Sequence, residues 1–313
     1  MTVRTWSHPM LSFAVHRLLR ALTVLVGVSF LTFIVGHMSG DPVLLMVRGD
    51  ATPKQRADLR HELGLDRPVL DQYGRYVAGA LHGDLGVSYR QRISVAPLIA
   101  MRLPKSLELA VSAFLVAITL AFMLGMAAAL NRGRALDHLI TALSIAGQVT
   151  PGFWLGLVLV LLFAVNWQLF PVSGAGAPAD LVLPALTLAI PTLGRIARLT
   201  RAGMLEVLGS DYIRTARAKG LSEWQVLFVH GARNALIPLI TQGGLEFGDM
   251  IGSAFIIETV FAWPGLGRMT VNAVLQRDFP VVQGCVLVTA AGFLLINLAV
   301  DLLYAVVDPR VRR

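Results

Sequence analysis

Two carboxylates stand three residues apart inside an apolar stretch of this 313-residue chain: Glu246 and Asp249, within residues 236–257. In a helix, side chains three residues apart share a face. A carboxylate at membrane depth is costly and normally faces a protein interior or a wet cavity. We therefore predict that both carboxylates line a path that favours cations or amino termini. The alternative is that they pair with a neighbouring helix.

A third polar residue, Gln148, stands in another apolar stretch, beside Pro151 and Gly152. Pro191, further along the chain, should kink its helix because it lacks a backbone donor and clashes with the preceding turn. Such kinks either serve packing alone or shape a path, and both interpretations stay open. Gln148 is added to the path candidates on this basis.

The sequence contains no motif that performs catalysis or binds a nucleotide. It has no phosphate-cradling G-x-x-x-x-G-K-[ST], no H-E-x-x-H and no G-x-S-x-G. The single cysteine, Cys285, lies in the last apolar block and excludes a disulfide within the chain. We expect no catalytic residue, no metal site and no cofactor on this chain, so any energy input must come from another polypeptide.

The segment Asp211–Pro238 is the only long polar stretch of the second half of the chain. Ser210 is a suitable N-cap, Asp211 adds charge at the first turn, and Gly220 suits a left-handed stop, which predicts a short basic helix over residues 210–220. Ser222 and Gln225 then form a capping-box pattern that begins a second helix. Two helices joined at a glycine make a compact knob.

Composition places these segments in a membrane. Hydrophobic residues make up 55% of the chain and charged residues 15%, and the mean hydropathy is +0.67. Blocks long enough to span a bilayer occur at about 18–36, 107–130, 138–165, 181–199, 236–257 and 284–307. They are apolar throughout and contain Gly and Ser, as packed membrane helices do. The fold class predicted is therefore all-α, with six transmembrane helices.

The net charge of +8 reflects membrane topology, because Lys and Arg cluster at the ends of the apolar blocks. Nucleic-acid binding is disfavoured. The basic residues predicted to be inside are Arg4, Arg17, Arg20, Arg132, Arg134, Arg195, Arg198, Arg201, Arg214, Arg217, Lys219, Arg233, Arg310, Arg312 and Arg313. Both termini and residues 200–235 are thus assigned to the cytoplasm. The first block lacks a small-x-small cleavage site and is expected to stay as a helix.

Three arginines, Arg195, Arg198 and Arg201, follow Pro191 at intervals of three. We expect them on one helical face, where they meet lipid phosphates or an acidic partner.

An external helical insertion is expected over residues 38–104. Thr52 and Gln55 form a capping box, Gly64 ends that helix, and a second helix runs from Pro68 to about Leu81. An extended piece over 83–89 and a short helix over 95–101 should return the chain to the membrane at Pro104. The insertion serves as a brace or as a gate. The remaining divisions expected are 1–37, a core over 105–307 that includes the 200–235 loop, and a tail over 308–313.

The polar segment resembles the cytoplasmic "EAA" loop of permeases from ATP-binding-cassette importers, specifically the dipeptide, oligopeptide and nickel group. The resemblance covers nearly the whole chain. It rests on residues 212–220 (YIRTARAKG) and 233–238 (RNALIP), and on the segments GDP at 40–42, LGLDRP at 63–68, GDLG at 83–86, FAWPGLGR at 261–268, RDFPVVQ at 277–283 and DPR at 308–310. Of the broad E-A-A pattern counted back from Gly220, only Ala216 matches, a departure that the peptide group shares.

The resemblance implies a type I importer permease fold in a bacterial inner membrane. The expected partners are a second permease, two ATPase subunits that carry ATP and Mg, and an extracytoplasmic substrate-binding protein. Residues 210–220 would then be the coupling helix that docks on an ATPase subunit, where Ala216 permits close approach. Its contact residues would be Asp211, Tyr212, Arg214, Ala216, Arg217, Lys219 and Gly220.

Other functions remain open at this point. Nickel or another small solute replaces peptides as the substrate in one alternative. A secondary transporter driven by an ion gradient, and a membrane scaffold without transport, belong to different classes of protein.

Overall fold

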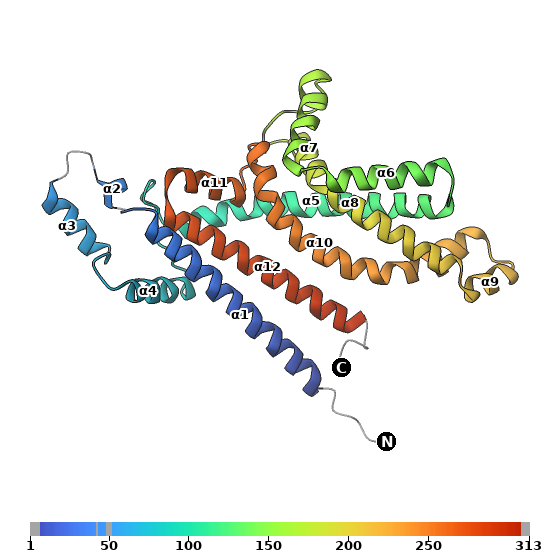
Figure 1. Cartoon of the computed structure of the whole chain (residues 1–313), viewed down its shortest axis with the longest axis horizontal. Coiled ribbons are helices and arrows are strands. Elements are labelled where there is room, and N and C mark those ends of the chain that lie inside the picture. Colours follow the sequence, from blue (N-terminus) through green and yellow to red (C-terminus); the bar gives the residue numbers. More distant parts are fainter. Residues whose placement is uncertain (1–6, 42, 48–51, 308–313) are drawn as a thin grey trace. The chain divides into compact units, whose positions relative to one another are not determined.

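The computed structural model of the chain describes residues 7–41, 43–47 and 52–307, and it is almost entirely helical (Figure 1). In the described ranges the only β pairing is an isolated bridge between Val87 and Ser94. The predicted tail, 308–313, lies outside them. The prediction of an all-α fold is confirmed.

The chain divides into two compact units. The first unit comprises Met1–Ser106 and Pro264–Leu295, and the second comprises Leu107–Trp263 and Ile296–Arg313. The helices of the chain are α1 (Ser7–Met38), α2 (Val43–Met46), α3 (Pro53–Glu62), α4 (Val69–Leu81), α5 (Val95–Leu130), α6 (Ala135–Val149), α7 (Gly152–Leu159), η1 (Val160–Asn166), α8 (Pro178–Leu208), α9 (Asp211–Ala218), η2 (Gln225–Ala232), α10 (Arg233–Val260), α11 (Leu266–Gln276) and α12 (Phe279–Val307).

Four helices in the described ranges are long and apolar enough to cross a membrane: Arg17–Met38, Val95–Leu130, Pro178–Leu208 and Phe279–Val300. A fifth span results if α6 and the α7–η1 segment, which meet at a bend of 111°, count as one. The remaining predicted span, over residues 236–257, corresponds to α10. This 28-residue helix is outside the set of helices named above. It carries Glu246, Asp249 and Glu258.

The insertion predicted over residues 38–104 contains the two helices that its sequence predicts, α3 and α4. Thr52 and Gln55 make a reciprocal capping box at the start of α3, and Gly64 takes a positive φ of 66° after α3 ends. The aromatic rings of Tyr73 and Tyr76 on α4 lie against Phe33 of α1. Burial raises the pKa of Tyr76 to about 12, so its hydroxyl stays protonated.

The predicted separate helix over 95–101 is wrong, because α5 runs without a break from Val95 to Leu130 with Pro104 inside it. Val95 and Ile99 are buried in the core of the first unit, together with Leu266, Val281 and Cys285. This packing holds the first turns of α5 in line even though Pro104 removes one helical hydrogen bond.

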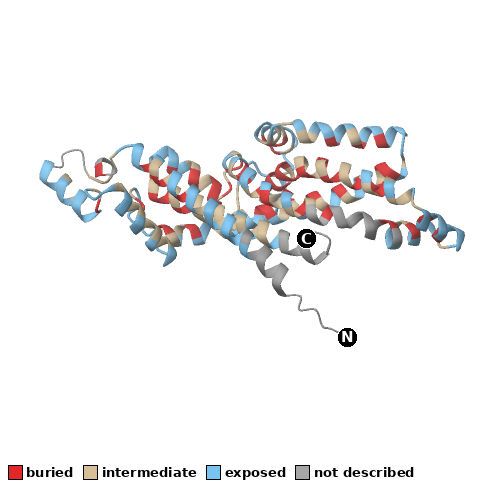
Figure 2. Cartoon of the chain, turned by 60° about the horizontal axis from the view of Figure 1, so that its bottom comes forward, coloured by how far each residue is buried: buried red, intermediate tan, exposed pale blue. Residues whose placement is uncertain are grey.

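The second unit packs around α8, which continues through both Pro184 and Pro191. Figure 2 shows buried residues interspersed with exposed ones along the helices. The core of this unit includes Leu109, Leu183, Met250, Phe261 and Trp263. Small residues bring the helices close together, as is typical of membrane bundles. A Cβ on Gly194 of α8 would lie 2.3 Å from the carbonyl oxygen of Ser144 on α6, so only glycine fits at this crossing.

Candidate functional site

Three arginines of α8 bind polar side chains on two neighbouring helices of the second unit. Arg195 binds Glu246 of α10, while Arg198 and Arg201 bind residues of α6. We call Arg195, Arg198 and Arg201 the arginine ladder. The ladder joins α8 to both helices that pack most extensively against it.

The ion pair between Arg195 and Glu246 places a buried carboxylate between α8 and α10. Glu246 is 2% exposed. The Nε atom of Arg195 lies 2.7 Å from Oε1 and 2.8 Å from Oε2 of the carboxylate, and Nη2 of Arg195 also binds Oε2. Thr192 donates to Glu246 at 3.2 Å and Gln242 donates at 3.1 Å. The buried charge is therefore both paired and hydrogen-bonded, as burial requires.

The other two arginines tie α8 to the two ends of α6. Arg201 binds Asp137 through two parallel hydrogen bonds of 2.6 and 2.8 Å, and Asp137 also accepts the backbone N–H of Gly133. Arg198 donates to the side-chain oxygen of Gln148. The prediction that these arginines meet lipid phosphates or an acidic partner is wrong, because all three bind residues of their own chain.

A cavity of about 360 Å³ opens beside the ladder, between the α6–α7 bend, α8 and α10. Its lining is largely apolar, with the hydroxyls of Thr150, Thr187, Thr192 and Ser253 and the charged groups of Arg195 and Asp249. Asp249 is exposed, whereas Glu246 is buried behind Arg195. Of the three path candidates, the structure thus places only Asp249 in this cavity, and Gln148 and Glu246 hold arginines.

The short helix α9 and the segment η2 form the knob that the sequence predicts. Ile213 and Ala216 of α9 pack with Val226 of η2 in a small apolar core, next to Val207 at the end of α8. Gly220 turns the chain between the two helices with φ of 76°. Ser222 and Gln225 exchange the expected capping-box hydrogen bonds, at 3.1 and 3.4 Å. A residue other than glycine would strain this turn.

The exposed side of α9 is charged. Arg214 lies 3.2 Å from Asp211, and Arg217 makes hydrogen bonds of 2.8 and 3.2 Å to the carboxylate of Glu223. These bonds raise the pKa of Arg217 above its usual value, so the side chain stays charged. Tyr212, Lys219 and Gly220 are also exposed. The knob therefore offers charged, partly pre-oriented groups on a rigid apolar base.

Models of two families match the chain. "Binding-protein-dependent transport system inner membrane component" matches residues 118–313, and the corresponding N-terminal family matches residues 10–110. The chain belongs to this family. The permease is 42% identical to the dipeptide transport system permease protein DppB of Escherichia coli (strain K12), over 97% of this chain and 99% of that protein.

Two other relatives have similar coverage. The di/tripeptide transport system permease protein DppB of Pseudomonas aeruginosa (strain UCBPP-PA14) is 40% identical, and the glutathione transport system permease protein GsiC of Escherichia coli O6:H1 is 41% identical. Each comparison covers 97% of this chain and 99% of the relative.

Solved structures share the fold of the permease at low sequence identity. The MetNI methionine ABC transporter in an inward-facing conformation matches with a TM-score of 0.58 and 17% identity, over 67% of this chain and 96% of that chain. A structure described as an amino acid ABC transporter with histidines matches with a TM-score of 0.53. The expected importer permease fold is confirmed.

Three details of the predicted knob differ in the permease. Ser210 stands at the N-cap position of α9, but its hydroxyl donates to the carbonyl of Val207 and makes no cap to α9. Ala216 is 7% exposed and packs inside the knob, so the close approach that it permits is to η2. The second helix starts at Glu223 and then becomes π-helical over Gln225–Ala232, which no sequence pattern indicated.

Three buried acids were missed by sequence reasoning, and one of them is Asp278, which is 2% exposed. Asp137 is 2% exposed and binds Arg201, and Glu258 of α10 is fully buried. The signal for Asp137 was available, because an acid at the start of an apolar block needs a cation. Its distance of 64 positions from Arg201 hid the partner.

The contacts of the arginine ladder predict how substitutions at Arg195 and Glu246 change the free energy of unfolding. Arg195→Met leaves Glu246 buried without its cation and should destabilise the permease by about 3–5 kcal/mol. The double variant Arg195→Met with Glu246→Leu should recover most of this loss, because neither charge remains buried. The thermal unfolding midpoint of the purified permease in detergent measures both effects.

Arg214→Met is the matched control, since its ion pair with Asp211 joins side chains that are 78% and 94% exposed. It should change stability by less than about 1 kcal/mol. A double variant as unstable as Arg195→Met alone would contradict this account of the ladder.

Proposed function

We propose that this permease forms half of the translocation path of an ATP-driven importer of short peptides. The observation that carries the proposal is the 42% identity to a dipeptide transport permease across 97% of this chain and 99% of the relative. The other two relatives are described by di/tripeptides and glutathione, which are also short peptides. The partners proposed are a second permease, two ATPase subunits that bind ATP and Mg, and an extracytoplasmic binding protein.

Energy reaches the path through α9 in this proposal. The charged side of α9, with Asp211, Arg214, Arg217 and Lys219, docks on an ATPase subunit in the cytoplasm, where both termini of the permease also lie. The apolar core of the knob keeps α9 fixed to the end of α8, which is continuous over 31 residues. A push on α9 is therefore carried along α8 as a rigid element.

The arginine ladder carries the movement to the cavity. Arg195 and Thr192 both bind Glu246 and line the cavity, so a movement of α8 carries α10 with it and displaces this part of the cavity wall. Closure of the ATPase pair with ATP supplies the free-energy difference that selects one conformation over the other. Asp249, exposed in the same cavity, is proposed to attract the amino terminus of the peptide.

Reconstitution tests the proposed function. We expect proteoliposomes that contain both permeases, the ATPase subunits and a loaded binding protein to take up a dipeptide such as alanyl-alanine only with ATP. The permease alone should show no uptake driven by an ion gradient. Gradient-driven uptake without ATPase subunits would identify a secondary transporter and end the proposal.

Substitutions at Gly220 test whether α9 docks on an ATPase subunit. Gly220→Trp adds a bulky side chain to the exposed turn and should reduce ATP-driven uptake at least about tenfold while ATP hydrolysis continues, because lost docking energy of ~1.4 kcal/mol is tenfold. Gly220→Ala is the matched control, since it imposes the same backbone strain at a positive φ with little bulk. Equal uptake by both variants would refute a contact at this turn.

Asp249 tests the cavity as a path. Asp249→Asn removes the negative charge and should lower the initial rate of dipeptide uptake by about fivefold or more, because a hydrogen bond to an ionised partner contributes ~1 kcal/mol more than one to a neutral partner. Asp249→Glu should retain most of the rate. Ser253→Ala, on the same cavity wall, is the control for a polar change without charge. An Asn variant with the wild-type rate would remove Asp249 from the path.

A further inference from the structure

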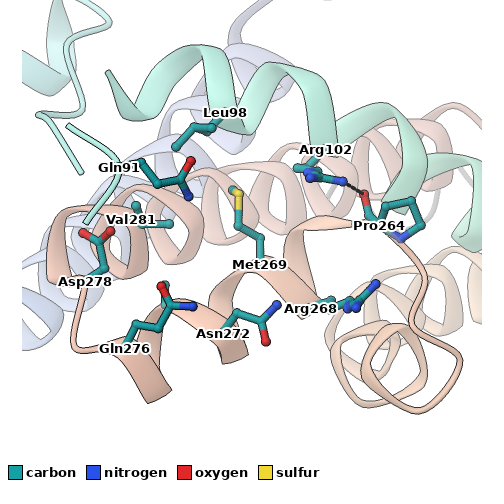
Figure 3. Close-up of a pocket in the computed structure, with 12 residues that line it drawn as sticks. Gln91, Leu98, Arg102, Pro264, Arg268, Met269, Asn272, Gln276, Asp278 and Val281 are labelled. Carbon is teal, nitrogen blue, oxygen red and sulfur yellow. Dashed lines mark hydrogen bonds between the residues drawn. The ribbon is translucent and has the colours of Figure 1, made fainter. Parts of the chain in front are cut away.

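A polar cleft in the first unit is separate from the Asp249 cavity. It has a volume of about 300 Å³ and lies between α5, α11, the loop before α11 and the start of α12 (Figure 3). Leu98, Met269 and Val281 supply apolar surface, and the polar part of the lining consists of Gln91, Arg102, Arg268, Asn272, Gln276 and Asp278. This size lies at the lower end of small-molecule sites, which run from about 300 to 1,000 Å³.

Arg102 supplies a cation at one end of the cleft. Its side chain is exposed, and its described hydrogen bond, to the carbonyl of Pro264, is long at 3.5 Å. The cleft wall beside it is fixed, because the hydroxyl of Ser106 accepts the backbone N–H of Leu266 at 2.8 Å. Arg102 thus keeps donor capacity toward the cleft beside a rigid turn.

Side-chain amides line the middle of the cleft. Asn272 and Gln276 lie one helical turn apart on α11, and Gln91 faces them from the loop before α5 (Figure 3). Each amide offers both donors and an acceptor, which is the pattern that a peptide group needs. The cleft therefore presents a guanidinium followed by amide groups.

Asp278, the acidic residue of the lining, binds the loop before α5 and not Arg102. It is 2% exposed, and its carboxylate accepts hydrogen bonds from the hydroxyl of Ser88 and from the backbone N–H groups of Tyr89 and Arg90. Gln91 in turn donates its backbone N–H to Ser88 at 2.9 Å. Asp278 thus holds the loop that presents Gln91.

We propose that this cleft binds the carboxyl end of a short peptide, with the terminal carboxylate on Arg102 and the adjacent peptide group on Asn272 and Gln276. Guanidinium groups bind carboxylates with two parallel hydrogen bonds, and these charge-assisted bonds are among the strongest in proteins. The inference rests on the proposed function, since it names the chemistry that the importer recognises. It gives the permease a carboxylate site in the first unit, complementary to the amino-terminus site at Asp249 in the second.

Binding to the assembled transporter, without its binding protein, tests the cleft. We expect alanyl-alanine to bind the complex in nanodiscs and Arg102→Gln to weaken this binding at least about tenfold. Alanyl-alanine amide, which lacks the carboxylate, should bind weakly to the wild type and be insensitive to Arg102→Gln. N-acetyl-alanyl-alanine, which keeps the carboxylate, should lose affinity in the Arg102→Gln variant. Acetate, added as a competitor, should bind far more weakly than the dipeptide if the amides contribute.

Arg277→Gln is the matched control, because Arg277 is exposed at the end of α11 and does not line the cleft. It removes the same charge and should leave binding unchanged. If Arg102→Gln does not assemble, Asn272→Ala, which removes only the amide contact, should weaken alanyl-alanine binding several-fold. The proposal would be overturned if these cleft variants left alanyl-alanine binding unchanged. It would also be overturned if the wild type bound alanyl-alanine amide as tightly as alanyl-alanine.

The same samples separate this inference from the proposed function. A complex that imports alanyl-alanine with ATP but does not bind it without the binding protein would overturn the cleft proposal and leave the importer intact. A complex that neither binds nor imports any peptide would overturn both.

Discussion

The buried ion pair between Arg195 and Glu246 is the constraint on which the second unit depends. A carboxylate at 2% exposure inside an apolar helix persists only with a cation and further hydrogen bonds. Arg195, Thr192 and Gln242 provide them, so α8 and α10 must keep one relative register for the charge to stay satisfied. Any movement of one helix must then carry the other with it or break a costly contact.

Close packing between α6 and α8 makes the rest of the ladder possible. Gly194 lets α8 approach the backbone of α6 at Ser144, on the stretch of α6 between Asp137 and Gln148. Arg198 and Arg201, each within two turns of Gly194, reach their partners across this crossing. A small residue and three long cationic ones thus act together: the glycine sets the distance, and the arginines fix the register.

Local sequence signals predicted the elements of this protein well. The capping boxes at Thr52 and Ser222 and the left-handed Gly220 depend on residues within a few positions of one another, and the structure shows all three. The partners of the arginines could not be predicted in this way. Arg201 and Asp137 are 64 positions apart, and the choice between a lipid phosphate and a carboxylate depends on which helices are neighbours. The continuity of α5 through Pro104 has the same origin, since tertiary packing of Val95 and Ile99 overrides a local helix breaker.

The position of Ala216 changes how the knob is understood. An alanine on a docking helix suggests close approach to a partner, yet Ala216 packs against η2 and leaves the charged side of α9 outward. A small residue inside the knob shortens the distance between α9 and η2 and stiffens their connection to α8 and α10. Because η2 leads directly into α10 while α8 ends next to α9, a rigid knob joins the end of α8 to the start of α10, the two helices that Arg195 and Glu246 also join within the bundle. In the proposed function, a force on α9 reaches both helices through the knob and through the Arg195–Glu246 pair. The cavity lies beyond that pair along both helices, with Asp249 three residues past Glu246 on α10.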